Sequence, residues 1–388
     1  MLEKVERKEP FQRSGRILII ADAYSPLSQE RGLVGMKGGY QIYWYSFPKA
    51  DLKDLAGAVT PPMGRIRWLS FLFSPLFLKR AIRKIRPDLI HVFYAYQQLD
   101  NLVLSRFRPL VLTVMGGDVL SDQSFRGRKK WLVKKVLEGA DIITSKSSFL
   151  DEVLDGIGDY ARKIRRVTWG VDIHRFSPGK EVHFLREQWD LEPDDLVFFS
   201  PRSCRPFYNQ DLIIKAFASY QSLHGEKKKA KLLIAELFSK EAYVKQLKGL
   251  VTEMGLQGKV RFVGAIPHQE MPVYFNLADI MVAIPQSDGM PLSLYEAMAC
   301  GTYPILGNLE TYRELIQDGV NGRFVKVGDV EALGEAMHWA AEHSEQRKTA
   351  AIINRQRIFE VADKDAQDRI VLSIYEELLK KYAKYNQT

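Results

Sequence analysis

Short apolar, β-branched runs alternate with helix-periodic stretches from one end of the chain to the other. Such alternation predicts parallel sheets covered by helices, the α/β class. The predicted strands are residues 17–21, 41–47, 89–94, 110–115, 141–145 and 165–170 in the first half, and 196–200, 231–236, 259–264, 279–285, 302–307 and 322–327 in the second. Six strands per half indicate two doubly wound α/β domains.

The polar stretch at 171–183, which contains Pro178 and Gly179, is typical of a linker between the two sets of strands. We therefore expect an N-terminal domain at 1–176 and a C-terminal domain at 177–364. The amphipathic pattern near the end predicts a C-terminal helix at 365–388 that packs back on the N-terminal domain.

Composition places the chain among globular proteins, because 46% of its 388 residues are hydrophobic and 27% are charged. Cys204 and Cys300 stand far apart in unrelated contexts, which argues against a disulfide framework and favours a reducing, cytoplasmic location. The first fifteen residues mix acids and bases and do not have the pattern of a signal peptide. The apolar run at 68–78 is too short for a membrane span and is interrupted by Pro75.

Positive charge is concentrated in the N-terminal half, where residues 1–176 hold 30 Lys and Arg against 18 Asp and Glu. This asymmetry favours a polyanionic partner, although a solvated basic face without a partner is the alternative. Segments 65–87 and 125–137 set basic residues beside bulky apolar ones, so we expect peripheral contact with an anionic membrane, such as the inner face of the plasma membrane. Alternatively, the apolar face of 65–87 is ordinary core. Neither segment has a nucleic-acid-binding signature, so no nucleic acid partner is expected.

Residues 287–301, SDGMPLSLYEAMACG, follow a predicted strand and begin a predicted helix. Pro291 suits the first helical position and Gly301 the C-terminal cap. The loop therefore lies at the carboxyl edge of a parallel sheet, where such sheets bind ligands. Free N–H groups at a helix start bind phosphate, and here they belong to Gly289, Met290, Leu292 and Ser293.

Asp288 and Glu296 flank this predicted phosphate site on either side of the helix start. Each carboxylate can accept hydrogen bonds from hydroxyls next to a phosphate, as in a sugar joined through phosphates to a ribose. The alternative is that an acidic residue near a helix N-terminus only stabilises the helix dipole, with Glu296 exposed to solvent.

The stretch from 287 onward, with TYPILGNLETYRELIQDGVNGRFVKVGD after it, resembles the nucleotide-sugar loop of family-4 retaining glycosyltransferases of the GT-B fold. Further matching motifs occur in family order: RPDLIHVFYAY, RPLVLTVMGGDVL, ADIITSKSS, VTWGVDIHRFSPG, SPRSCRPFYNQDLIIKAF and VRFVGAIPHQEMPVYFNLADIMVAIPQSDG. The resemblance covers nearly the whole chain. It implies two domains facing each other across a cleft, with a nucleotide-sugar bound by the C-terminal domain and the acceptor by the N-terminal one.

The resemblance also implies roles for individual residues. Glu296 would hold the ribose hydroxyls and Asp288 the transferred sugar, while the loop that contains Gly264 and Ile266 would contact the base. Arg202 matches an arginine that binds the donor diphosphate. The family lysine falls at Tyr208, with Asn209 in place of a glycine, so Arg205 is a candidate substitute, or else a surface arginine.

On the acceptor side the resemblance places Gly116, Gly117 and Asp118 along the cleft, and Met115 where relatives often carry His or Trp. Met cannot exchange a proton, so any mechanism that needs a histidine at this position is excluded. Asp118 could instead cap a turn. His91 is a further candidate for the cleft, although a lone His among apolar residues is more often buried in the core.

Motifs for phosphoryl transfer on a Walker loop, zinc hydrolysis and serine hydrolysis are absent from the sequence. The resemblance predicts a retaining, metal-independent hexosyltransferase without a cofactor. It would act on a glycan or lipid-linked acceptor in surface polysaccharide or glycoconjugate biosynthesis. Two alternatives stay open: a nucleotide-sugar 2-epimerase of the same fold, and a non-catalytic nucleotide-sugar-binding protein, suggested by Met115 and Tyr208.

Overall fold

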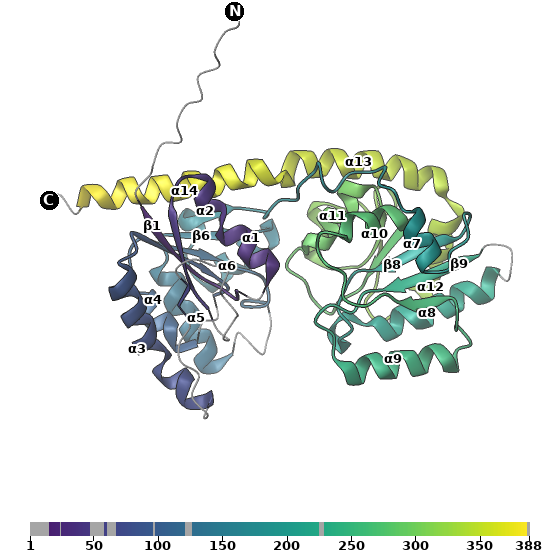
Figure 1. Ribbon diagram of the computed structural model, residues 1–388, viewed down its shortest axis with the longest axis horizontal. Helices are drawn as coiled ribbons and strands as arrows, with labels where there is room; N and C mark the ends of the chain where they lie inside the picture. Colours follow the sequence, from purple (N-terminus) through teal and green to yellow (C-terminus); the bar gives the residue numbers. More distant parts are fainter. Residues whose placement is uncertain are drawn as a thin grey trace, which may run out of the picture. The chain divides into compact units, whose positions relative to one another are not determined.

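The chain forms two compact units in a computed structural model that describes residues 15–23, 25–46, 58–59, 67–95, 98–120, 126–224 and 229–385. Unit 1 comprises Met1–Thr168 together with Gln367–Thr388, and unit 2 comprises Trp169–Ala366. The first boundary lies eight residues before the expected one at 176, and the second lies two residues after the expected one at 364. Figure 1 shows both units as sheets covered by helices.

The described part of unit 1 contains a parallel sheet in the order β3-β2-β1-β4-β5-β6-β7. Its strands are β1 (Arg16–Ile20), β2 (Gln41–Tyr45), β3 (Ala58–Val59), β4 (Leu89–Phe93), β5 (Leu110–Thr113), β6 (Ile142–Ser145) and β7 (Ile164–Arg166). All six strands predicted for the first half are present. Only the two-residue β3 was not predicted, because so short a segment carries no detectable alternation.

Helices cover both faces of this sheet, since both faces of its central strands are apolar. They are α1 (Pro26–Gly32), α2 (Val34–Lys37), α3 (Arg67–Ile85), α4 (Asn101–Leu104), α5 (Gly127–Gly139), α6 (Ser148–Ile157) and α14 (Lys364–Tyr385). Leu18, Ile90 and Leu112 belong to the core under α3, α4 and α5. Ile19 and His91, which are register partners, point to the opposite face.

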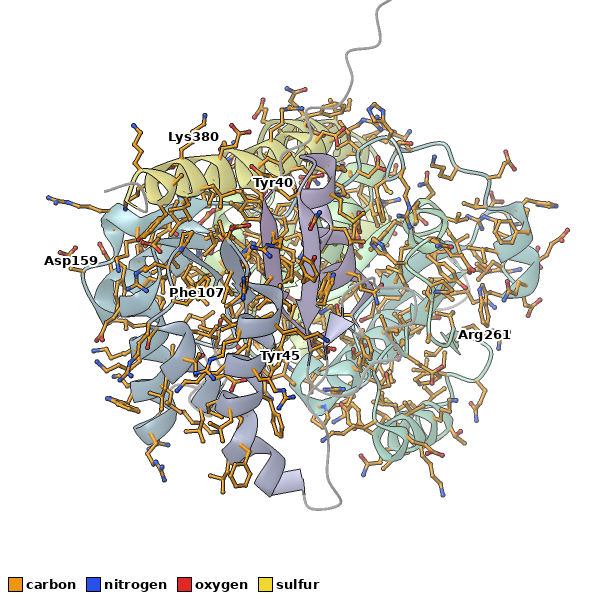
Figure 2. All side chains as sticks on the ribbon, turned by 60° about the vertical axis from the view of Figure 1, so that its left-hand side comes forward. Tyr40, Tyr45, Phe107, Asp159, Arg261 and Lys380 are labelled. Atoms are coloured by element: carbon orange, nitrogen blue, oxygen red, sulfur yellow. The ribbon has the colours of Figure 1, made fainter. Side chains whose placement is uncertain are left out.

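The C-terminal helix α14 packs on that opposite face. His91 Nδ1 lies 2.7 Å from Tyr375 Oη, and Lys37 Nζ lies 2.6 Å from Asp368 Oδ2. Tyr40 packs edge-on against Tyr375 with ring centroids 6.0 Å apart. Figure 2 shows Tyr40 on the side of α14 that faces the sheet and Lys380 projecting away from it. The last helix is therefore an integral part of unit 1.

Unit 2 contains a parallel sheet of six strands in the order β10-β9-β8-β11-β12-β13. The strands are β8 (Leu196–Ser200), β9 (Ala230–Ile234), β10 (Val260–Phe262), β11 (Ile280–Ala283), β12 (Tyr303–Gly307) and β13 (Arg323–Val325). Each was predicted from the sequence, and the prediction of doubly wound α/β domains is confirmed. The strand order reverses between β8 and β11, the point at which open α/β sheets bind ligands.

Alternate residues of the unit 2 strands enter two separate cores. Phe199 and Met281 belong to the core that holds α10 and α11, whereas Phe198 and Val282 belong to the core under α8 and α12. The helices are α7 (His183–Gln188), α8 (Gln210–His224), α9 (Glu241–Glu253), α10 (Met271–Leu277), α11 (Leu292–Cys300), α12 (Val330–Glu342) and α13 (Ser344–Ala362). Burial on both faces holds the strand ends in place and so fixes the loops that follow them.

Candidate functional site

Two loops meet where the strand order of unit 2 reverses. Arg202 follows the end of β8, and Asp288 follows the end of β11. Their side chains form an ion pair, with Arg202 Nη2 2.8 Å from Asp288 Oδ2, and only 15% and 11% of these side chains are exposed. Burial by itself lowers the pKa of Arg202, but Asp288 and the neighbouring tyrosine hydroxyls reverse the effect and leave it above its ordinary value. Arg202 therefore stays charged.

Asp288 is held by further donors. Its Oδ2 accepts a hydrogen bond from the Tyr312 hydroxyl at 3.2 Å, and its Oδ1 accepts one from the Gly289 N–H at 2.8 Å. The Thr311 hydroxyl donates to the Asp288 carbonyl at 3.1 Å. Burial is the larger cause that raises the pKa of Tyr312 well above its ordinary value, and the charge of Asp288 is the next. Tyr312 therefore keeps its proton and remains a hydrogen-bond donor. Sequence reasoning predicted the location of Asp288 but missed its pairing with Arg202 and Tyr312.

Tyr208 covers the guanidinium of Arg202, with the Arg202 Cζ 4.6 Å from the ring centroid. The next residue, Asn209, adopts the left-handed conformation with φ 53°, and its side chain donates to the Ile284 carbonyl at 2.7 Å. Asn tolerates this conformation better than other residues with a side chain, which explains why a glycine is not required here. Arg205 is exposed, and its Nε donates to the Phe238 carbonyl at 2.7 Å.

Helix α11 begins at Leu292, and Pro291 is its N-cap rather than its first residue. The expectation for Pro291 was wrong by one position, because its ψ of 144° is extended and not helical. No side chain caps this N-terminus, and Met290 before it is buried with φ 67°. Ser293 Oγ accepts a 3.4 Å hydrogen bond from Arg202 Nη1. The uncapped N–H groups of α11 thus lie beside a buried cation, as an anion site requires.

Gly301 ends α11 in the left-handed conformation, with φ 86°. Its role as the C-terminal cap is therefore confirmed. Glycine suits this position because it has no Cβ to clash in the left-handed region.

Glu296 is buried in the second turn of α11, with 4% of its side chain exposed. The alternative of a solvated Glu296 is therefore wrong. His268 Nε2 lies 2.6 Å from Glu296 Oε1, and Arg175 Nη2 donates to the His268 carbonyl at 2.6 Å. The His268 ring also lies against Phe176, with centroids 5.6 Å apart. A buried carboxylate needs such a partner, and sequence reasoning missed His268.

The loop expected to contact the base lies directly before His268. Gly264 has φ 74°, and its N–H donates to Glu236 Oε2 at 2.9 Å. A Cβ built on Gly264 meets no atom within 4 Å, so its surface is open to a ligand. Ile266 is buried in the same core as residues of α11. His268, two residues after Ile266, brings this loop to Glu296, and no signal in the sequence indicated that contact.

Asp118 of unit 1 caps its own turn. Its carboxylate accepts hydrogen bonds from the N–H groups of Ala95 at 2.8 Å, Gly116 at 2.9 Å and Met115 at 3.1 Å. Burial raises the pKa of Asp118, while these hydrogen bonds lower it. The Asp118 side chain is fully buried and accepts hydrogen bonds from the backbone. The prediction that Asp118 lines the cleft was therefore wrong, and the alternative that it caps a turn is correct.

The two glycines before Asp118 differ in exposure. Gly116 is buried with φ 107°, a conformation that favours glycine, and Gly117 is exposed. A Cβ built on Gly117 would meet only the Tyr94 hydroxyl, at 3.8 Å. Gly117 is therefore the member of this turn that a ligand can reach.

His91 is a core residue, and its expected place in the cleft was wrong. Its ring is 3% exposed and lies between Tyr375 Oη at 2.7 Å and Thr113 Oγ1 at 2.8 Å. Burial lowers the pKa of His91 to about 3, which keeps the imidazole neutral. His91 thus joins β4 and β5 to the C-terminal helix.

Two family models match the chain. Residues 181–357 match glycosyl transferases group 1, and residues 62–147 match the glycosyl transferase 4-like family. Together these matches cover more than half of the chain, and the first of them contains Arg202, Asp288 and Glu296. The match to unit 2 thus includes the Arg202–Asp288 pair, His268 and Glu296.

Curated relatives match about half of the chain. D-inositol 3-phosphate glycosyltransferase 1 of Catenulispora acidiphila is 24% identical over 200 residues, which is 50% of this chain and 47% of the relative. The GDP-mannose-dependent alpha-(1-6)-phosphatidylinositol monomannoside mannosyltransferase of Mycolicibacterium smegmatis is 23% identical over 53% of this chain and 54% of the relative. The chain spans about half the length of the curated relatives it matches.

Solved structures show the same fold over nearly the whole chain. Anabaena HepE in complex with UDP and glucose superposes with a TM-score of 0.77 at 18% identity, covering 94% of this chain and 100% of that one. Sucrose-phosphate synthase of Thermosynechococcus elongatus superposes with a TM-score of 0.79 at 19% identity, covering 95% and 100%. The expected GT-B fold is confirmed over nearly the whole chain, and the expected family is confirmed for residues 181–357, which match glycosyl transferases group 1.

Proposed function

We propose that the protein is a retaining hexosyltransferase that moves a sugar from a nucleotide-sugar to a hydroxyl of a glycan or lipid-linked acceptor. The observation that carries this proposal is the largely buried Arg202–Asp288 pair beside the uncapped start of α11, with the buried Glu296 one turn further on. This arrangement offers a cation and free N–H groups to a diphosphate, and carboxylates to the hydroxyls on either side of it.

Each residue has a distinct role in the proposed reaction. Glu296, oriented by His268, accepts hydrogen bonds from the ribose hydroxyls, while Gly264 and Ile266 contact the base. Arg202 and the N–H groups of α11 bind the diphosphate and stabilise the charge that develops on it as it leaves. Asp288 accepts a hydrogen bond from a hydroxyl of the transferred sugar.

Retention follows if the acceptor attacks the face of the sugar from which the diphosphate leaves. The bond between the anomeric carbon and the acceptor oxygen forms as the bond to the phosphate oxygen breaks. The proton of the acceptor hydroxyl passes to that phosphate oxygen. In this route the side chain of Met115 has no role in proton transfer. The route also requires no metal, because Arg202 and the N–H groups of α11 balance the negative charge of the leaving diphosphate.

The proposed donor site is tested by thermal unfolding with UDP, GDP and ADP, each with and without its common sugars. One nucleotide should raise the melting temperature, because a ligand at 100 times its Kd stabilises the folded state by about 2.7 kcal/mol. Glu296→Gln should remove most of this rise. Glu335→Gln, an exposed change on α12, is the matched control and should keep it. If no nucleotide stabilises the wild type, the proposal fails.

Turnover is tested separately from binding. The donor identified by stabilisation is incubated with glycan acceptors, and the anomeric configuration of the product is read by NMR, with and without EDTA. Retention without a metal requirement is expected. An inverted product would refute the retaining mechanism, and activity lost in EDTA would refute metal independence. Donor epimerised without any acceptor would indicate an epimerase.

We also propose that unit 1 touches an anionic membrane surface, on the cytoplasmic face, where a polysaccharide or glycoconjugate acceptor would be presented. Within the described residues no helix is long and apolar enough to span a bilayer. Helix α3 buries Leu78 and Ile85 in the core but exposes Leu72, Phe73 and Leu76 by half or more. Residues 65–66 and 125 of the predicted membrane segments, and the side chains of 67–71, lie outside the described part of the chain.

Basic residues follow the exposed apolar side chains of α3. Lys79, Arg80, Arg83 and Lys84 are all exposed. Each cation near an anionic leaflet contributes about 1 kcal/mol, so this end of α3 is suited to a charged interface. The double change Phe73→Ser and Leu76→Ser should reduce sedimentation with phosphatidylglycerol vesicles. Unchanged sedimentation would refute the contribution of α3.

A further inference from the structure

Unit 1 contains a pocket of about 420 Å³ between α5 and the turn that follows α4. The lining residues that matter here are Arg106, Arg108, Trp131, Lys135, Glu138 and Gly139. Gly139 brings the two elements together, because a Cβ there would lie 2.4 Å from the Ser105 Cα. The pocket floor is therefore built by a close backbone approach.

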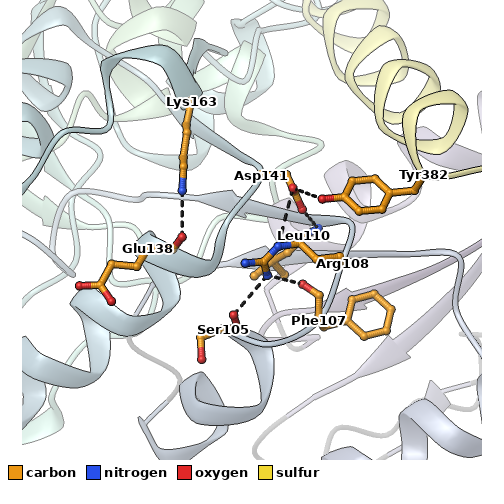
Figure 3. Close-up of polar contacts among 8 residues, drawn as sticks. All are labelled: Ser105, Phe107, Arg108, Leu110, Glu138, Asp141, Lys163 and Tyr382. Atoms are coloured by element: carbon orange, nitrogen blue, oxygen red, sulfur yellow. Dashed lines mark hydrogen bonds and ion pairs between the residues drawn. The ribbon is translucent and has the colours of Figure 1, made fainter. Parts of the chain in front are cut away.

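Three cations line this pocket against one carboxylate. Lys135 Nζ lies 2.9 Å from Glu138 Oε2, which balances that pair. Arg108 is held in place through Nη1, which donates to the carbonyls of Ser105 at 3.2 Å and Phe107 at 2.7 Å (Figure 3). Arg106 is exposed; its backbone N–H donates to the Val103 carbonyl at 3.1 Å, but its guanidinium makes no hydrogen bond or ion pair with any residue that the structure describes. The lining thus carries a net positive charge.

The nearby acid Asp141 reduces this excess without removing it, because the three cations then face two carboxylates. Its Oδ1 lies 3.8 Å from Arg108 Nε and accepts from the Tyr382 hydroxyl, and its Oδ2 accepts from the Leu110 N–H at 2.8 Å (Figure 3). Lys163 donates to the Glu138 carbonyl at 2.8 Å. Burial lowers the pKa of Lys163, and the charge of Arg108 lowers it further, whereas the charges of Asp141 and Glu138 raise it by less.

The aromatic member of the lining is Trp131, and it is 52% exposed. An indole at this exposure gives the pocket an apolar wall beside its cations, which suits the organic part of a charged ligand. Arginine guanidinium groups bind phosphate oxygens through paired N–H donors, and Arg106 and Arg108 stand two positions apart on one turn.

We propose that this pocket binds a phosphate group, with Arg106 as the principal ligand, Arg108 as a pre-positioned second cation and Trp131 against the carrier. The phosphate belongs either to a soluble phosphomonoester or to a lipid headgroup. The inference does not rest on the proposed donor chemistry, because the pocket lies in unit 1 and the proposed donor site in unit 2.

Two probes and two variants of the full chain test the proposal. Glycerol 3-phosphate is titrated by calorimetry, and phosphatidic acid in phosphatidylcholine vesicles is tested by sedimentation against phosphatidylcholine alone. Arg106→Gln should weaken binding about tenfold, the effect of one charge-assisted hydrogen bond. The matched control is Arg128→Gln, which removes the same charge from an exposed position of α5 outside the pocket lining.

If Arg106→Gln, but not Arg128→Gln, weakens binding of glycerol 3-phosphate, the pocket binds a soluble phosphate ligand. If Arg106→Gln weakens only the binding of phosphatidic acid vesicles, the pocket binds a lipid headgroup. Equal loss in Arg106→Gln and Arg128→Gln overturns the proposal, because diffuse surface charge would then explain the binding. Absence of binding to both probes also overturns it. Stabilisation by nucleotide should be unchanged in Arg106→Gln, which separates this result from the fate of the proposed donor site.

Discussion

Breaking the Arg202–Asp288 pair should destabilise unit 2 more than removing both of its charges. The two side chains are 15% and 11% exposed and meet at 2.8 Å, so either single change leaves one buried charge without its partner. We consider Arg202→Met, Asp288→Asn and the double variant. Removing one partner of a buried pair costs about 3–5 kcal/mol, whereas replacing both is often nearly neutral.

The lower end of that range, about 3 kcal/mol, applies to Arg202→Met, because Asp288 keeps the hydrogen bonds from Tyr312 and Gly289. In a unit of about 200 residues, 1 kcal/mol shifts the melting temperature by about 2–4 °C. Arg202→Met should therefore melt about 6–12 °C below the wild type and Asp288→Asn at least as far below it, and the double variant should melt at or above the less stable single one.

Differential scanning calorimetry measures these shifts, and the transition of unit 2 is identified in the wild type as the one that a bound nucleotide raises. The sum of the two single shifts is compared with the shift of the double variant. If the shifts add, the pair is not coupled and the reasoning is refuted. All three variants should also lose stabilisation by nucleotide, because each lacks a proposed contact to the diphosphate or the sugar. This loss does not depend on how far the variant itself is destabilised.

Three further changes test other parts of the fold. Gly170→Ala should lower the free energy of unfolding by several kcal/mol, because φ is 54° and the added Cβ would lie 2.5 Å from the Lys364 Cα; a stable variant would contradict this. Gly249→Ala, inside α9 with no atom within 4 Å of the added Cβ, should instead stabilise the protein by about 0.5–1 kcal/mol. The folded pKa of His91 is about 3 against 6.5 when unfolded, so its contribution to stability is present above pH 6.5 and is lost as pH falls toward 3. Urea titrations should show a shallower loss of stability between pH 6.5 and 4 in His91→Gln than in the wild type, and identical slopes would refute the burial argument.

Most of the fold could be predicted from the sequence because both sheets are buried on both faces. Their strands are therefore continuous apolar runs between polar turns, a local signal. The unpredicted strand, Ala58–Val59, has only two residues and no such signal. The misplaced start of α11 has a different cause: the φ of Pro291 suits both an N-cap and a first helical residue, and only its ψ distinguishes them.

The site was only partly predictable, because its contacts join residues that are distant in sequence. The spacing of Asp288 and Glu296 around a helix start indicated a ligand site, yet nothing local indicated that Arg202, 86 positions earlier, pairs with Asp288. His268 gave no signal of its own, since a single histidine in a loop has many possible roles. His91 and Asp118 were predicted to line the cleft, but both are buried. Neither burial nor hydrogen bonding to the backbone can be inferred from a residue's neighbours along the chain.

The Arg202–Asp288 pair also bears on how the proposed donor would enter. A diphosphate that takes Arg202 replaces one anion beside the guanidinium with another, so the buried cation stays neutralised and the exchange avoids leaving it unpaired. Asp288 is then released toward its remaining donors, Tyr312 and Gly289, and can accept a hydrogen bond from a sugar hydroxyl. Tyr208 brings an aromatic ring and no positive charge to Arg202, so Arg202 and the start of α11 would bear most of the charge of the proposed diphosphate. For this reason a change at Arg202 should weaken donor binding more than the same change at Arg205, whose side chain is exposed and bound to the Phe238 carbonyl.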